Sequence, residues 1–97
     1  MAMARRPLII DCDPGVDDAI ALLLALASGQ EFDLVGITTV AGNVPLAHTH
    51  GNARRVCALA QATAVPVLAG CPRPLVHGLT TAEAIHGPTG LAGAELP

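Results

Sequence analysis

The stretch DCDPGVDD, residues 11–18, carries four aspartates in eight positions and contains no lysine or arginine. Each ionised carboxylate raises the free energy of ionising its neighbours. Such a cluster is therefore expected where a cation binds it or where two carboxylates share a proton. Donors that are all oxygen favour a hard cation, Ca²⁺ or Mg²⁺, over Zn²⁺. The segment predicts a divalent-cation site.

Two common motifs do not explain the cluster. Counted from Asp11, the twelfth position is Leu22, where an EF-hand requires Glu. The Gly-x-Gly-x-x-Gly fingerprint of dinucleotide-binding folds is absent. A purely structural interpretation makes one aspartate a helix cap and leaves the others solvated, but capping needs only one of them.

The elements that would position these aspartates follow from the apolar pattern. Residues 7–12, 32–40 and 65–70 are short apolar or β-branched runs, which predict strands. Residues 17–29 and 45–62 predict helices, the first capped by Gly29 and the second opened by Pro45. Alternating strands and helices predict an α/β fold with two right-handed crossovers and a parallel sheet.

Ligand sites in parallel sheets form at the carboxyl ends of the strands. Asp11 and Asp13 lie at the end of the first predicted strand, and Asn43 lies just past the second. We therefore expect these side chains to meet at one edge of the sheet. Asp17 and Asp18 open the first helix, where adjacent side chains diverge by about 100°. We expect the two to have different roles.

Two features indicate the front part of a larger domain. Residues 19–27 are apolar on every side, which is typical of a helix covered all round. Residues 77–97 hold four glycines and no sustained period. Three strands and two helices are too few to cover such a helix.

Composition excludes several classes of protein. The 97-residue chain has a formal net charge of −3 and 13% charged residues, which argues against a nucleic-acid partner. Its most apolar run, residues 19–27, is shorter than the roughly 20 residues that span a bilayer. The start, MAMARRPLII, lacks the long apolar run of a signal peptide. Three cysteines at irregular spacing predict reduced thiols in a cytoplasmic protein.

Four blocks of the sequence resemble, in order, the N-terminal part of the inosine-uridine preferring nucleoside hydrolase family. They are DCDPGVDDAIALLLA, GITTVAGNVPLAHTHGNARRV, VPVLAGCPRPLV and IHGPTG. The resemblance runs from about residue 7 to the end. It implies a parallel-sheet, Rossmann-like nucleoside hydrolase fold, of which this chain is the first βαβαβ portion. Residues 1–97 would form the N-terminal part of a single, incomplete domain.

The resemblance also implies an activity. Members of the family hydrolyse the N-glycosidic bond of ribonucleosides to free base and ribose, with a tightly held Ca²⁺. We therefore expect a ribonucleoside substrate, no nucleic-acid or membrane partner, and a homodimer or homotetramer for the complete protein. The remaining calcium ligands and the acid that protonates the leaving base would lie beyond Pro97, so we expect the isolated chain to be inactive.

Roles carry over to matching motif positions. Asp13 matches the general base, which is also a calcium ligand, and Asp18 matches a bidentate calcium ligand. Asp11 matches the leading aspartate of the motif, for which we expect a supporting contact.

Three further positions match substrate contacts. Asp17 and Asn43 match residues that hold ribose hydroxyls, and His86 matches a histidine on the loop over the nucleobase. An isolated histidine in a Gly-Pro-rich loop is also often simply solvated, so both interpretations of His86 stay open.

Other interpretations of the chain remain. It could be a non-catalytic truncated remnant or interaction module that retains weak divalent-cation binding, or part of a hydrolase of another ribosyl compound. We assign no role to Asn52, which could serve packing or capping. Arg54 and Arg55 are expected to be solvated, and Cys12 to be oxidisable if exposed.

Overall fold

Three parallel strands form the sheet of the computed structural model, which describes residues 4–97. The strands are β1 (Arg6–Cys12), β2 (Phe32–Thr39) and β3 (Val67–Ala69), in the spatial order β1-β2-β3. Helix α1 (Val16–Ala27) joins β1 to β2, and helix α2 (Leu46–Leu59) joins β2 to β3. The predicted α/β class and the parallel sheet are confirmed.

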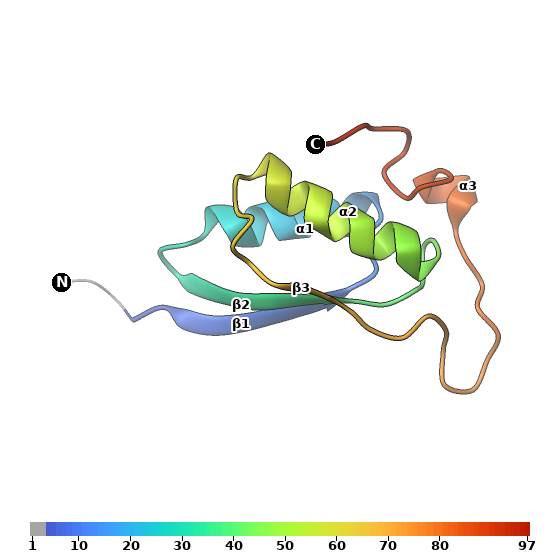
Figure 1. The fold of residues 1–97 in the computed structure, drawn as a ribbon, viewed down its shortest axis with the longest axis horizontal. Helices are drawn as coiled ribbons and strands as arrows, with labels where there is room; N and C mark the ends of the chain where they lie inside the picture. The colour runs from blue at the N-terminus through green and yellow to red at the C-terminus, as the bar shows by residue number, and fades with distance from the viewer. Residues whose placement is uncertain (1–3) are drawn as a thin grey trace.

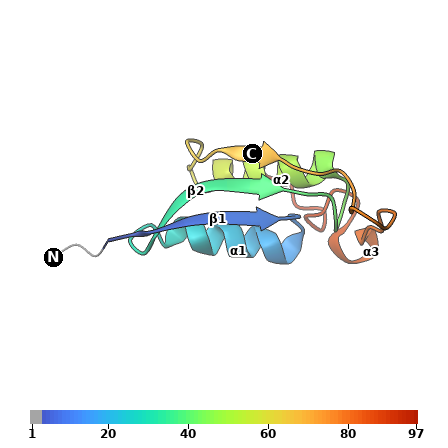
Figure 2. The same ribbon diagram turned by 90° about the horizontal axis from the view of Figure 1, so that it is seen from below.

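Both long helices cover the same face of the sheet (Figure 1), and the view from below shows the strands in front of them (Figure 2). Successive right-handed crossovers that step along a sheet in one direction place their helices on one side. The strands all run toward the end of the molecule where α3 (Glu83–His86) lies (Figure 2). Within residues 4–97, no helix covers the opposite face of the sheet.

The core lies between the sheet and the two helices. Leu22 of α1, Ile37 of β2 and Val56 of α2 are all 0% exposed. Alternate residues of β1, Ile10 and Cys12, also belong to this cluster, as expected for a strand with one buried face. Full burial of an aliphatic side chain contributes about 1.5–3 kcal/mol, so each of the three fully buried side chains stabilises the packing of the helices on the sheet.

The outer side of α1 is apolar and uncovered. Val16, Ile20 and Leu24 are spaced four apart, which places them in one stripe along the helix, and Leu24 is 69% exposed. Only Ala19 and Leu22 of this helix are buried. The sequence predicted a helix covered all round, and residues 4–97 supply cover for one side of it.

A second apolar surface lies on the strands. Ile9 of β1, Val35 of β2 and Leu68 of β3 are exposed, whereas Ile10 and Val67 pack against the core. Alternation along a strand sends neighbouring side chains to opposite faces. The exposed side chains of β1 and β3 therefore belong to the face that lacks a helix.

The ends of the predicted helices, 17–29 and 45–62, differ from the structure by one to three residues. Helix α1 ends at Ala27, and Ser28, not Gly29, is the C-cap residue. The Ser28 hydroxyl donates to the Leu24 carbonyl at 2.8 Å. This bond satisfies one of the last carbonyl groups of the helix, which glycine could not do because it has no side chain. Helix α2 begins at Leu46, with Pro45 as its N-cap residue, and ends at Leu59 rather than at residue 62.

Residues 77–97 are mostly irregular, as the sequence predicted, and contain the four-residue helix α3. Several contacts attach the segment to the rest of the fold, including a hydrogen bond and a buried side chain. The Ala82 N–H donates to the Asn43 carbonyl at 2.7 Å, and Leu91 is 7% exposed within the core cluster. These contacts hold α3 beside the carboxyl ends of β1 and β2.

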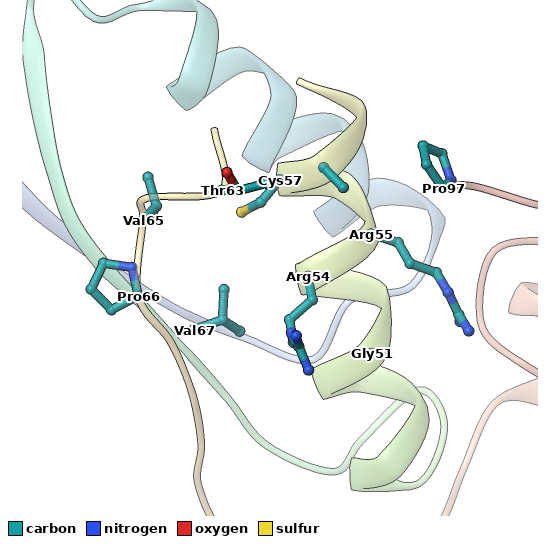
Figure 3. Close-up of a pocket in the computed structure, with 10 residues that line it drawn as sticks. Gly51, Arg54, Arg55, Cys57, Thr63, Val65, Pro66, Val67 and Pro97 are labelled. Atoms are coloured by element: carbon teal, nitrogen blue, oxygen red, sulfur yellow. The ribbon is translucent and has the colours of Figure 1, made fainter. Parts of the chain in front are cut away.

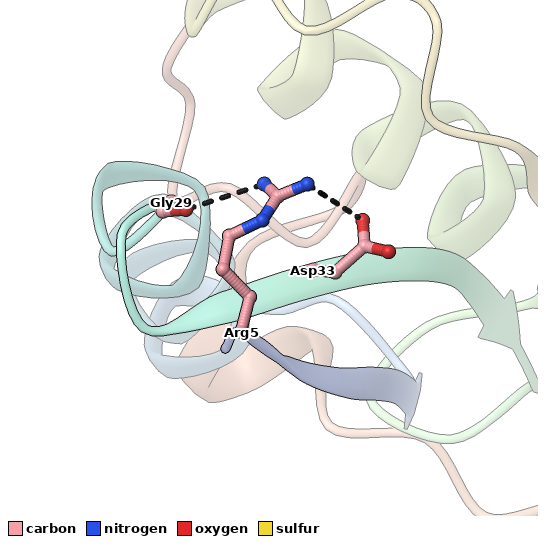
Figure 4. Close-up of polar contacts among 3 residues, drawn as sticks. All are labelled: Arg5, Gly29 and Asp33. Atoms are coloured by element: carbon pink, nitrogen blue, oxygen red, sulfur yellow. Dashed lines mark hydrogen bonds and ion pairs between the residues drawn. The ribbon is translucent and has the colours of Figure 1, made fainter. Parts of the chain in front are cut away.

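An exposed ion pair lies at the amino ends of the strands, far from α3. Arg5 donates to the Gly29 carbonyl at 3.2 Å and lies 3.7 Å from Asp33 (Figure 4). Both side chains are more than half exposed, and such pairs contribute about 0–1 kcal/mol. Among residues 4–97, no helix is long and apolar enough to cross a membrane. Residues 1–3, which begin the stretch MAMARRPLII that is not expected to be a signal peptide, lie outside the described residues.

Candidate functional site

Asp13 and Asn43 meet at the carboxyl ends of β1 and β2, where the sequence predicted a site. The Asn43 N–H donates to Asp13 Oδ2 at 2.8 Å, and the Asn43 side-chain amide donates to the Asp13 carbonyl at 2.9 Å. Two hydrogen bonds fix one residue against the other. The parallel sheet brings together two residues that are 30 positions apart.

Asp18 closes the turn from the side of α1. Its Oδ2 accepts the N–H of Asp13 at 3.1 Å. Burial raises the pKa of the Asp18 carboxyl, and a side-chain hydrogen bond and the negative charge of Asp13 raise it further. The charge of Asp13 is therefore close enough to disfavour ionisation of Asp18. This is the crowding that the DCDPGVDD stretch predicted.

Two glycines make this close packing possible. A Cβ atom at Gly42 would overlap the Asp13 carboxylate. A Cβ atom at Gly15 would overlap the His86 ring and approach the Asn43 amide nitrogen to 2.8 Å. Any side chain at these positions would displace a candidate site residue.

Asp11 and Asp17 lie at the edges of this arrangement. Asp11, within β1, accepts a hydrogen bond from the Thr38 hydroxyl at 2.7 Å. Asp17, in the first turn of α1, is exposed. A carboxylate in the first turn is favoured by the helix dipole. Asp17 is thus open to solvent while its neighbour Asp18 is drawn into the turn, so the two carboxylates differ as their helical positions predicted.

His86 lies against the start of α1. Its Nδ1 accepts the N–H of Val16 at 3.0 Å, one of the N-terminal donors that a helix cannot satisfy internally. The contact joins residues 70 positions apart. His86 is therefore placed beside the aspartate turn rather than free in a solvated loop.

Asn52, for which the sequence indicates no role, contacts the aspartate turn directly. Asn52 is 0% exposed on α2. Its side-chain amide donates to the Pro14 carbonyl at 3.1 Å and to the Thr89 carbonyl at 2.6 Å. An asparagine within a helical pattern gives no sign of such partners, because they are carbonyl groups of distant segments.

Cys12 lies between two site aspartates and is buried. Burial, followed by the charges of Asp18, Asp11 and Asp13, raises the pKa of its thiol to about 12. The thiolate is the reactive form of cysteine. Cys12 therefore serves packing. Its oxidation was expected only if the thiol were exposed, and the thiol is buried.

A hollow of about 570 Å³ lies away from the aspartates, between α2 and the segment that enters β3 (Figure 3). Arg54 and Arg55 line it together with apolar side chains, and both arginines are exposed as predicted. None of the site aspartates borders this hollow. The hollow is therefore separate from the aspartate turn.

The donor set for a cation is partial. Asp13 and Asp18 supply carboxylate oxygens side by side, and oxygen donors suit Ca²⁺ or Mg²⁺. Residues 4–97 contain no group of three or more His, Cys, Asp or Glu side chains placed to hold a metal. Six to eight oxygen ligands are usual for Ca²⁺, so further ligands are needed to complete such a site.

Comparison with known proteins identifies relatives over nearly the whole chain. An inosine-uridine preferring nucleoside hydrolase of Leishmania major is 48% identical over 92 residues. A pyrimidine-specific ribonucleoside hydrolase of Photobacterium profundum is 51% identical over 92 residues. Each match covers 95% of this chain and 29% of the relative. The chain therefore spans less than a third of the length of these relatives.

The fold has a counterpart among solved structures. A plant nucleoside hydrolase, PpNRh1, superposes with a TM-score of 0.85 at 33% sequence identity. The match covers 97% of this chain and 30% of that enzyme. The sequence profile of the inosine-uridine preferring nucleoside hydrolases matches residues 8–97. The chain thus belongs to the inosine-uridine preferring nucleoside hydrolase family, as its four motif blocks predicted.

Proposed function

We propose that this chain supplies the first part of a Ca²⁺-dependent ribonucleoside hydrolase. One observation supports the proposal most strongly: Asp13, Asn43 and Asp18 lie together at the carboxyl ends of β1 and β2. The motif positions matched in the sequence are therefore also neighbours in space. Family membership supplies the reaction class.

The residues fit a hard divalent cation. Burial and the neighbouring Asp13 raise the pKa of Asp18, a cost that a bound cation would remove. The Arg5–Asp33 ion pair lies at the other end of the sheet (Figure 4), so Arg5 does not offset the negative charge of the aspartate turn. Asp13 and Asp18 would hold the ion. When bound, Ca²⁺ supplies positive charge that offsets the crowded carboxylates and anchors the sugar hydroxyls.

Asp13 is the proposed general base. Its Oδ2 is fixed by the Asn43 N–H at 2.8 Å, which orients the carboxylate for proton transfer. Asp13 takes a proton from a water molecule whose oxygen forms a bond to C1′. The C1′–N bond breaks, and its electron pair leaves with the base. Negative charge near the sugar stabilises the oxocarbenium character of this transition state.

The remaining residues bind or support. Asp17 is exposed at the start of α1, where a ribose hydroxyl can reach it, and Asn43 is the second proposed ribose contact. His86 is proposed to contact the nucleobase from α3. Asp11, held by Thr38, supports the turn. The acid for the leaving base is proposed to come from outside these residues.

We further propose that residues 1–97 are the N-terminal part of a single larger domain. The uncovered stripe of α1 and the exposed side chains Ile9 and Leu68 of the sheet support this view, because large exposed apolar surfaces mark interaction sites. The relatives, of which this chain spans 29%, have the length to supply the cover. Assembly into dimers or tetramers, a ribonucleoside substrate and a cytoplasmic location remain part of the proposal.

A second candidate function is a non-catalytic module with weak divalent-cation binding. The two-carboxylate donor set within the described residues favours it, since affinity depends on the number of charged ligands. Such a module would bind the cation through Asp13 and Asp18. It would release no ribose from nucleosides, either alone or joined to the rest of a hydrolase.

A chimera separates the two candidates. Residues 8–97 of this chain replace the matching segment of the Photobacterium profundum hydrolase, which is named as pyrimidine-specific. Release of ribose from uridine is measured with Ca²⁺ present. The proposal predicts turnover in the chimera. Its Asp13→Ala variant is expected to lose turnover by about 10³-fold or more, because a general base contributes about 10²–10⁴-fold and Asp13 would also bind the metal.

The matched control is Asp33→Ala, which removes an aspartate at the far end of the sheet and is expected to keep near-normal turnover. A folded chimera that keeps full activity after Asp13→Ala would reject the assigned base. A folded chimera without turnover would favour the non-catalytic module.

A further inference from the structure

Asn52 is a buried polar residue that the proposed reaction does not use. Its side chain is 0% exposed, and its Oδ1 has no hydrogen-bond partner. An unpartnered buried acceptor costs about 1–3 kcal/mol. A purely apolar residue at this position in α2 would avoid that cost, so the side-chain amide nitrogen must provide something that offsets it.

The amide nitrogen joins two segments that are remote in sequence. It donates to the Pro14 carbonyl at 3.1 Å and to the Thr89 carbonyl at 2.6 Å. A primary amide has two N–H groups, so both are used. Pro14 follows Asp13 directly, and Thr89 lies three residues after His86. Asn52 therefore ties the aspartate turn to the segment that carries His86.

Other contacts show how closely these two segments fit. The Val16 N–H donates to His86 Nδ1 at 3.0 Å, and the Ala92 N–H donates to the His86 carbonyl at 2.7 Å. A Cβ atom at Gly90 would lie 2.8 Å from Asn52 Nδ2 and 3.1 Å from the Pro14 carbonyl. Residues 86–92 thus pack directly on the Asn52 amide and the turn.

We propose that Asn52 is a positioning residue that sets the His86 ring against the aspartate turn. Its relevance to hydrolysis rests on the proposed function, whereas its effect on the two segments does not. With Nδ1 accepting from Val16, the neutral ring carries its proton on Nε2. Asn52, through Thr89 and Pro14, keeps this tautomer and presents Nε2–H as a donor.

The experiment is NMR spectroscopy of the 97-residue chain without substrate, at about pH 8. Two signals are followed: the ring ¹⁵N shifts of His86, which report the tautomer, and hydrogen exchange of the Val16 and Ala92 amides. The variant is Asn52→Leu, which keeps the branched shape and the number of side-chain heavy atoms and removes both donors. The control is Thr49→Val, which removes another buried hydrogen bond of α2, to the Val40 carbonyl at 2.9 Å.

Asn52→Leu is expected to speed exchange of both amides by about tenfold or more, relative to amides of β2, and to shift the His86 ring toward mixed tautomers. Thr49→Val is expected to leave the His86 tautomer unchanged. Equal behaviour of the two variants, or a His86 ring unaffected by Asn52→Leu, would overturn the proposal.

If Asn52→Leu does not fold, Gly90→Ala decides. Its methyl group would push residues 86–92 off the amide without altering α2, so loss of the single His86 tautomer supports the proposal and its persistence overturns it. These signals need no turnover. A chain that shows them but forms part of no active hydrolase would reject the proposed function and leave the positioning role of Asn52 intact.

Discussion

At the scale of the residue, the charge of Asp18 sets the electrostatic behaviour of the metal-free turn. Burial and Asp13 raise its pKa above the ordinary value of 3.8. The folded chain therefore binds this proton more tightly than the unfolded chain does. The stability that the protonated carboxyl contributes is fully present below pH 3.8, and it is lost as the pH rises through the raised pKa.

The Asp18→Asn variant tests the direction of this pH dependence of stability. In the presence of a chelator, its free energy of unfolding relative to wild type is expected to increase as the pH rises from about 4 toward neutrality, because the variant has no charge to bury. Urea unfolding at a series of pH values measures the difference, with Asp33→Asn as the control for loss of a carboxylate. A difference that stays constant or decreases with pH would contradict the assignment.

Gly42 and Gly29 allow the space around a glycine to be tested by the same substitution, to alanine, at a crowded and at an open position. A Cβ atom at Gly42 would overlap the Asp13 carboxylate, whereas one at Gly29 would meet nothing within 4 Å. Gly42→Ala is expected to lower the free energy of unfolding by about 1–3 kcal/mol, and Gly29→Ala to change it by less than about 0.5 kcal/mol. Urea unfolding of both variants gives the comparison, and equal effects would show that Asp13 does not require this close approach.

At the scale of the element, α1 has one packed side and one uncovered side. Leu22 is 0% exposed and Leu24 is 69% exposed, although the sequence is apolar at both positions. Leu22→Ala is expected to cost about 2–5 kcal/mol because it leaves a cavity, and Leu24→Ala about 0.5 kcal/mol or less. Chemical unfolding checks the order. A large cost for Leu24→Ala would mean that the outer stripe is covered in solution, for example by a second copy.

The elements themselves were predictable because their apolar periods are strong. The strand, helix, strand, helix, strand order and the parallel sheet agree with the structure, and so does the meeting of Asp13 with Asn43. Helix ends were less accurate. The C-cap fell at Ser28 rather than Gly29, since a serine hydroxyl that bonds back to Leu24 competes with glycine in a way that the pattern does not reveal.

The role of Asn52 could not be predicted, and neither could that of Gly42. Asn52 acts through the carbonyl groups of Pro14 and Thr89, and main-chain partners leave no trace in residue types. The crowding at Gly42 depends on where the Asp13 carboxylate lies after folding. Both effects arise from packing between segments, which a single sequence specifies only through the whole fold.

Across the whole molecule, residues 4–97 form a sheet with helices on one face, and two apolar surfaces are uncovered. One is the α1 stripe of Val16, Ile20 and Leu24, and the other includes Ile9 and Leu68 on the sheet. The chain spans 29% of relatives such as the Leishmania major hydrolase. At the site, Asp13 and Asp18 lie side by side, and residues 4–97 contain no group of three or more His, Cys, Asp or Glu side chains placed to hold a metal.

The most direct test of the account is a Ca²⁺ titration of the 97-residue chain by calorimetry, repeated on Asp13→Asn, Asp18→Asn and Asp33→Asn. We predict weak binding to the wild-type chain, with a dissociation constant on the order of 10⁻³ M, because two carboxylates form part of a site. Binding should be lost in the Asp13 and Asp18 variants and kept in Asp33→Asn. Unchanged binding after Asp18→Asn would contradict the assignment of the aspartate turn as the cation site.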